Sequence, residues 1–179
     1  MQTYHLGALD GMAPQVHPEA WIAPGAVLVG AVTIGPRASV WYGSVLRADD
    51  DQIEVGAGCN IQDLCCLHVD EGEPAILAEQ VTLGHRAIVH GAYIGAGALI
   101  GIGAIVLGRA RIGAGSLIAA GTVIRPGQHI PPGVLAAGVP GRVVRELTEE
   151  DRATFADSAD RYVQRAARHH GASWTGPGS

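Results

Sequence analysis

Residues 94–130 read IGAGALIGIGAIVLGRARIGAGSLIAAGTVIRPGQHI, with an aliphatic residue at every sixth position. The anchors of this run are Ile94, Ile100, Val106, Ile112, Ile118, Ile124 and Ile130. The N-terminal half repeats the pattern with Ile22, Leu28, Ile34, Val40 and Leu46. A short repeat of fixed length predicts a parallel β-helix built from hexapeptide units, in which each repeat buries its aliphatic residue against its neighbours. The predicted fold is therefore mainly β.

Two acidic segments interrupt this repeat. Asp49-Asp50-Asp51-Gln52 delays the next anchor, Val55, by three residues, and the segment 70–74 delays Leu77 by four. Counted across both interruptions, the chain contains 18 hexads, which make six turns if three hexads form one turn. A regular coil offers only a regular surface, so we expect function where the repeat is broken.

The composition agrees with a narrow aliphatic coil and excludes several classes of function. Hydrophobic residues make up 47% of the chain but aromatic residues only 4%. The net charge of −5 argues against nucleic acid as a partner, because phosphate binding requires clustered positive charge. Glycines interrupt every long apolar run, so no membrane span is predicted. Without a recognisable signal segment, and with three cysteines expected to be reduced, the chain is predicted to be cytoplasmic.

The limits of the repeat divide the sequence into three parts. Residues 1–147 are predicted to form the β-helix, with an N-terminal entry segment up to residue 21 and a C-terminal cap after residue 130. Residues 148–170 are predicted to form an α-helix, because Thr148 can cap it and acidic residues follow in the first turn. Residues 171–179 are expected to be a disordered tail.

Three histidines lie beside the second interruption. His68 and His90 both stand second in their hexads, three hexads apart. Three steps of a three-sided coil return to the same face one turn higher, about 4.8 Å away. Two imidazoles at that separation can both reach a zinc ion at about 2.0–2.1 Å per Zn–N bond. The other histidines outside this cluster are expected to face solvent: His5, His17, His129, His169 and His170.

His85 does not share this column, because it stands third in the preceding hexad and should lie on the neighbouring face. One chain therefore offers two converging ligands and one divergent ligand. A symmetric oligomer resolves this if His85 of one subunit completes the site of the next. A three-sided coil favours a trimer whose interfaces close into a ring.

Four stretches carry a specific resemblance: Arg47-Ala48-Asp49, Asn60-Ile61-Gln62-Asp63, Cys66-Leu67-His68 and residues 84–91, GHRAIVHG. In residue type and spacing they resemble the γ-class carbonic anhydrase family over about residues 10–170. The resemblance implies a left-handed parallel β-helix, a homotrimer, and a Zn²⁺ ion (or Fe²⁺ or Co²⁺) at each subunit interface. It also implies reversible hydration of CO₂ to bicarbonate by hydroxide held on the metal.

The resemblance also implies roles for individual residues. His68 and His90 would bind the metal from one subunit and His85 from its neighbour. Gln62 would hydrogen-bond the metal-bound solvent or bicarbonate, while Arg47 and Asp49 would form inter-subunit salt bridges. A carboxylate of the same network matches Asp63, and a tyrosine that approaches the metal resembles Tyr162. For Arg47, Asp49 and Tyr162, purely structural roles remain as alternatives.

The chain departs from the best-characterised members in the loop after His68, which is short here although Glu71 and Glu73 are present. A long insertion in those members carries a glutamate that is thought to transfer protons. Two other classes of function remain open on the sequence alone. Hexapeptide β-helices also include acyltransferases that use one histidine as a general base, and a metal hydroxide can act as a thioesterase on acyl-CoA. A catalytically silent, metal-binding trimer would carry the same ligands.

Overall fold

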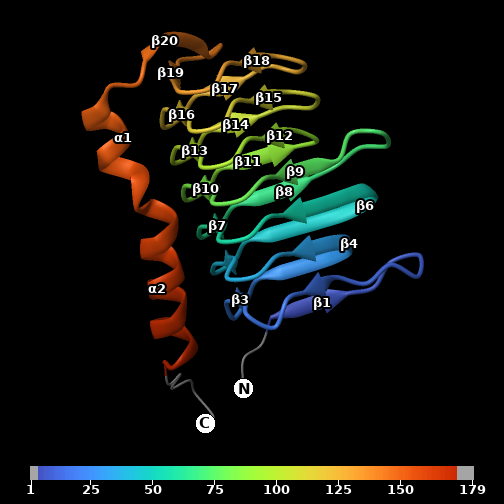
Figure 1. Ribbon diagram of the computed structural model, residues 1–179. Helices are drawn as coiled ribbons and strands as arrows, with labels where there is room; N and C mark the ends of the chain where they lie inside the picture. Colours follow the sequence, from blue (N-terminus) through green and yellow to red (C-terminus); the bar gives the residue numbers. More distant parts are fainter. Residues whose placement is uncertain (1–3, 173–179) are drawn as a thin grey trace.

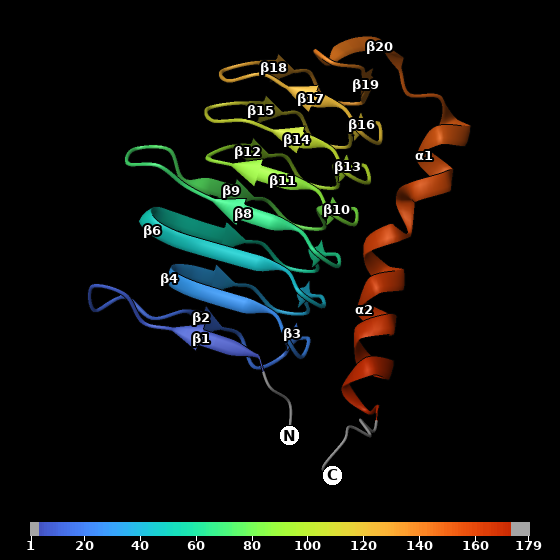
Figure 2. The same cartoon turned by 180° about the vertical axis from the view of Figure 1, so that it is seen from behind.

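The chain forms a three-sided coil of short parallel strands, with a helical segment running back along one side (Figures 1 and 2). The computed structural model describes residues 4–172. One side is an eight-stranded sheet in the order β20-β19-β16-β13-β10-β7-β5-β3, in which only β20 is antiparallel. Its seven parallel strands mark seven rungs of the coil. The predicted class, a left-handed parallel β-helix of hexapeptide repeats with a C-terminal helical segment, is confirmed.

The other two sides belong to one twelve-stranded sheet, because β4 and β6 are long enough to bend across both sides. The first half of β6 pairs with β8 and its second half with β9. The strands of the first side are β3 (Trp21–Ile22), β5 (Ser39–Val40), β7 (Asn60–Ile61), β10 (Thr82–Leu83), β13 (Leu99–Ile100), β16 (Leu117–Ile118), β19 (Val134–Ala137) and β20 (Arg142–Glu146). The strands of the other two sides are β1 (His5–Gly7), β2 (Gln15–Val16), β4 (Val27–Ile34), β6 (Val45–Val55), β8 (Cys66–His68), β9 (Ala75–Leu77), β11 (Ile88–His90), β12 (Tyr93–Ile94), β14 (Ile105–Val106), β15 (Arg111–Ile112), β17 (Val123–Ile124) and β18 (His129–Ile130).

The hexad anchors fill the interior, as the period predicts. Leu83, Ile100 and Ile118 stack in register on successive rungs and are each fully buried. Burying one such side chain contributes about 1.5–3 kcal/mol, so the column of anchors is the main source of stability. Cys59 and Cys65 belong to this core, and burial raises the pKa of both thiols to about 12. Both act as small apolar residues there.

The coil extends beyond the run of hexads at both ends. In the predicted entry segment, β1 and β2 already pair in parallel with β4. In the predicted cap, β19 adds a seventh rung above β16 before β20 turns back along it. Both interruptions of the repeat lie at the same corner of the coil: the first follows Arg47, and the second follows His68 on the next rung. The first is absorbed within the eleven-residue strand β6, and the second forms the loop between β8 and β9 that projects from the coil in Figure 1.

The C-terminal segment forms two helices, α1 (Glu149–Ala156) and α2 (Ser158–His170), which meet at Asp157. The predicted N-cap is confirmed. The Thr148 hydroxyl accepts from the Asp151 backbone amide, and the Asp151 carboxylate accepts from the Thr148 backbone amide. The helical segment descends along the side of the eight-stranded sheet (Figure 2). No helix within residues 4–172 is both long and apolar enough to cross a membrane. Residues 173–179 of the predicted tail lie outside the described part.

An aromatic cluster attaches α2 to the first rungs of the coil. Tyr162 packs edge-on against Trp41, with ring centroids 5.2 Å apart, and Trp41 also contacts Trp21. The expectation that His169 faces solvent is wrong. Its ring lies 4.9 Å from that of Trp41, and its Nδ1 is 2.7 Å from the Tyr42 hydroxyl. The end of α2 brings it to this cluster, a contact that the hexad register does not describe.

Candidate metal centre

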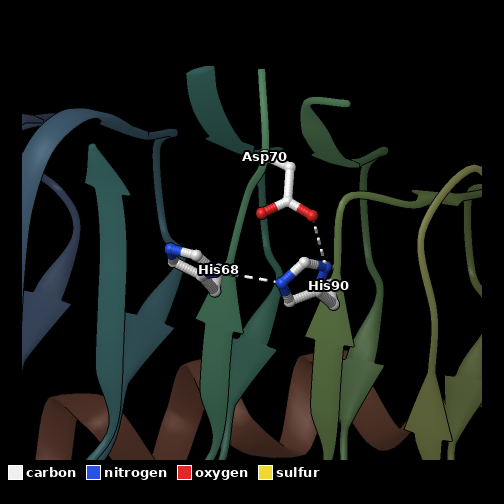
Figure 3. Close-up of side chains that lie close together, drawn as sticks. All are labelled: His68, Asp70 and His90. Carbon is white, nitrogen blue, oxygen red and sulfur yellow. Dashed lines mark hydrogen bonds and ion pairs between the residues drawn. The ribbon is translucent and has the colours of Figure 1, made fainter. Parts of the chain in front are cut away.

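His68 and His90 lie side by side at the ends of two neighbouring parallel strands. They end β8 and β11, and the sheet register pairs them with each other and His68 with Arg47. The predicted alignment of His68 with His90 is therefore confirmed, and Arg47 stands in the same column. Figure 3 shows the two imidazoles turned toward one another, with His68 Nδ1 and His90 Nε2 separated by 3.0 Å.

A carboxylate faces the opposite nitrogen of each ring. Asp49 Oδ1 lies 2.8 Å from His68 Nε2, and Asp70 Oδ2 lies 3.8 Å from His90 Nδ1 (Figure 3 shows the second pair). The carboxylate on His68 Nε2 favours the tautomer that carries the proton there, which leaves His68 Nδ1 as the acceptor in its 3.0 Å contact with His90 Nε2. Burial, and then the nearby Arg47 guanidinium, lower the pKa of His68, so its neutral form is favoured.

The inner nitrogens fit a tetrahedral metal ion. Two ligands at about 2.0–2.1 Å from tetrahedral zinc lie about 3.3–3.4 Å from each other. The observed 3.0 Å is close to that separation without any movement of the backbone. Imidazole donors suit Zn²⁺ and also divalent iron and cobalt, so the residues present fit the metals named from the sequence.

His85 lies apart from this pair, in the turn between β10 and β11. Within residues 4–172, two groups of three residues have ligand atoms that all lie within 4.8 Å of one another: His68, Asp70 and His90, and Asp49, Asp50 and His68. His85 is in neither group. Its side chain is 44% exposed, and its Nδ1 lies 2.8 Å from Asp63 Oδ2.

The charged residues around the pair are also paired within the chain. Arg47 forms an ion pair with Asp49, and the Arg47 side chain is half exposed. Glu73 pairs with Arg109 at 2.7 Å and is largely covered, whereas Glu71 is exposed. The Glu73–Arg109 pair fastens the short loop against the coil. The loop therefore keeps Asp70 beside His90.

Gln62 follows β7 and is 6% exposed. Its Nε2 donates to Asn60 Oδ1 at 3.1 Å, and its backbone carbonyl accepts from the Ser44 hydroxyl. Asn60 was not among the residues predicted for the site. It stands directly before an anchor, where its side chain lies on the outer face of the rung, and the sequence alone carries no sign that this side chain is buried. Tyr162 is buried against Trp41, which supports its packing role.

Comparisons with known proteins place this arrangement in a family. A "Probable carbonic anhydrase" from Methanocaldococcus jannaschii is 53% identical over 143 residues, which cover 80% of this chain and 90% of that protein. "Gamma carbonic anhydrase 1, mitochondrial" from Arabidopsis thaliana is 39% identical over 163 residues, or 88% of this chain and 59% of that protein. The chain belongs to the γ-class carbonic anhydrase family.

This γ-class member also resembles proteins named for another activity. A family model of the bacterial transferase hexapeptide (six repeats) matches residues 91–126. A solved structure of a hexapeptide transferase family protein from Anaplasma phagocytophilum has a TM-score of 0.88 and 38% identity. The match covers 93% of this chain and 98% of that one. Because proteins with this fold are named both as carbonic anhydrases and as transferases, the activity has to be argued from the site.

Proposed function

We propose that this chain forms a homotrimer that catalyses the reversible hydration of CO₂ to bicarbonate at metal centres between subunits. His68 and His90 of one subunit would bind the ion together with His85 of the next. One observation carries the proposal: two imidazoles in register bring His68 Nδ1 and His90 Nε2 to 3.0 Å from each other, where an ion bound by both could replace the hydrogen bond between them. The family relationship supports the same ligand set.

When bound, a Zn²⁺ ion held by neutral imidazoles supplies a water whose pKa is about 7, as in zinc carbonic anhydrases generally. The chain's own residues prepare the ligands for that ion. Asp49 and Asp63 lie 2.8 Å from the outer nitrogens of His68 and His85 and can accept the ring proton there, and Asp70 lies 3.8 Å from the outer nitrogen of His90. Gln62 supplies a neutral amide that can orient a reactant without adding charge.

A row of exposed apolar side chains supports the trimer. Val45, Cys66, Ile88, Ile105 and Val123 stand in register along the face that ends at His68 and His90. All five are at least partly exposed, and Ile88 and Cys66 are among the exposed residues. A second subunit seated on this row would bury it and could bring its own His85 to the pair. The same contact would then cover the apolar row and supply the third histidine of the metal site.

Replacing Ile88 by aspartate should disrupt the trimer, because a carboxylate would have to be buried in the centre of this apolar row. We expect the wild type to elute with about three times the chain mass of 18.4 kDa and the variant as a monomer that no longer retains zinc. Size-exclusion chromatography with light scattering measures the mass of both proteins, and the zinc content of each eluted peak shows whether the metal is retained. Val144→Asp is the matched control, because Val144 is 59% exposed on β20. A trimeric Ile88→Asp protein would contradict the proposed interface.

Replacing Asp63 by asparagine should weaken zinc binding by about 10–100-fold, because His85 loses the carboxylate that holds its tautomer. Competition with a chromophoric chelator measures the affinity. Asp10→Asn, at an exposed turn near the N-terminus, should leave the affinity unchanged. Equal zinc affinities for Asp63→Asn and wild type would show that the Asp63–His85 pair does not serve the metal.

Stopped-flow measurement of CO₂ hydration by the zinc-loaded trimer tests the activity itself. We expect hydration that depends on zinc and disappears with a chelator. Acetyl transfer from acetyl-CoA that proceeds without metal would favour the transferase class instead. Stoichiometric zinc with neither activity would favour a catalytically silent metal-binding trimer.

A further inference from the structure

A chain of buried hydrogen bonds connects Gln62 to helix α2. Gln62 Nε2 donates to Asn60 Oδ1 at 3.1 Å, and Asn60 Nδ2 donates to Thr82 Oγ1 at 2.8 Å. The Thr82 hydroxyl lies 3.3 Å from Ser158 Oγ, at the start of α2. Asn60 is fully buried, and Thr82, Gln62 and Ser158 are at most 9% exposed. Exchange of these partners with water is therefore restricted.

The donors and acceptors in this chain run in one direction. The Thr82 hydroxyl donates to Ser158 Oγ, and because a hydroxyl has a single proton it can then only accept from Asn60. Asn60 must then turn its NH₂ toward Thr82 and its carbonyl oxygen toward Gln62. Gln62 in turn must donate its NH₂ to Asn60, which leaves its Oε1 as the atom that is not engaged with Asn60. If Thr82 donated to Asn60 instead, both amides would reverse.

The polar side chains occupy only part of their column. The outer slot of successive rungs holds Trp21, Ser39, Asn60, Thr82, Leu99 and Leu117. Thr82 lies on the rung directly above Asn60, and leucine takes the same slot on the next two rungs. Burying an amide and a hydroxyl costs free energy unless they are hydrogen-bonded, and leucine would pack there without that cost. The polar residues therefore stand where they can act on Gln62.

We infer that Thr82 and Ser158 are positioning residues that fix the orientation of the Gln62 amide and present Oε1 as an acceptor. The C-terminal helix is then a working part of the site. The catalytic consequence rests on the proposed function, whereas the orientation of the amide does not.

Hydrogen exchange of side-chain amides tests the orientation without metal or substrate. In protein labelled with ¹⁵N-glutamine, the Gln62 NH₂ signal is assigned by its loss in Gln62→Glu. We expect this NH₂ to exchange about tenfold faster in Thr82→Val, corresponding to the loss of one buried hydrogen bond. Ser158→Ala should also accelerate exchange, and Thr82→Ser should restore protection. In the zinc-loaded enzyme, kcat should fall about tenfold in Thr82→Val and recover in Thr82→Ser.

Thr122→Val is the matched control, because the Thr122 hydroxyl is buried and makes no hydrogen bond within residues 4–172. It should change neither the Gln62 signal nor kcat. Unchanged Gln62 exchange in Thr82→Val overturns the inference, and if that variant does not fold, unchanged exchange in Ser158→Ala does so. A wild type with a protected Gln62 amide but no CO₂ hydration would refute the proposed function and leave the positioning role standing.

Discussion

Replacing His90 by alanine should lower the zinc affinity on the order of 10³-fold or more and abolish CO₂ hydration. His90 Nε2 lies 3.0 Å from His68 Nδ1, so its removal leaves one imidazole where two converged. Loss of an outer partner of a ligand costs about 10–100-fold, and loss of the ligand itself must cost more. Competition with a chelator of known affinity measures the first effect, and stopped-flow kinetics at saturating zinc measures the second.

The control for this variant is His129→Ala. His129 also lies on a short strand of the coil, but it stands before its anchor and is exposed on β18, away from β8 and β11. Its removal should change neither zinc content nor activity. Tight, stoichiometric zinc in His90→Ala would mean that the ion binds elsewhere, and the proposed centre would then be wrong.

The alignment of the histidines could be predicted from the sequence because every hexad has the same length. Each step of six residues moves the chain to the next side, so the pairing of His68 with His90 and the divergence of His85 could both be predicted. The structure confirms the pairing. The assignment of His85 to a neighbouring subunit remains a prediction, and the row of Cys66 and Ile88 beside the pair supports it.

The hexad pattern predicted less of the structure where the chain departs from the six-residue repeat. The carboxylate positions of Asp49 and Asp70 depend on how the two acidic interruptions fold, the first within β6 and the second as a loop, and neither conformation follows from the six-residue period. The short strands β1, β2 and β19 extend the coil although their sequences are not clean hexads. Backbone pairing with an existing rung is sufficient to continue the coil there.

Contacts with the C-terminal helix were also outside the reach of the pattern. The periodicity of residues 149–169 predicts an apolar face but not the rungs on which it docks. The positions of His169 beside Trp41 and of Ser158 beside Thr82 depend on that docking. For the same reason, the hydrogen bonds that connect Asn60 and Thr82 to α2 could not be predicted from the sequence.

Replacing Ile100 by alanine should destabilise each chain by about 2–5 kcal/mol, the range for truncating a large aliphatic residue in a packed core. Ile100 is fully buried and lies in register between Leu83 and Ile118. The rungs above and below are hydrogen-bonded to its own, so they cannot close around the cavity. Urea unfolding at equal protein concentrations, followed by far-UV circular dichroism, measures the change in unfolding free energy.

Leu99→Ala removes a side chain of the same size from the neighbouring residue, which faces outward and is only partly buried. Its cost should be clearly smaller, because solvent or the adjacent helix can occupy the space. Equal losses for the two variants would mean that the inward anchors do not dominate the stability of the coil. The interior of this narrow coil contains almost only such anchors and small residues, so the difference between positions 99 and 100 measures directly how the six-residue period stabilises the fold.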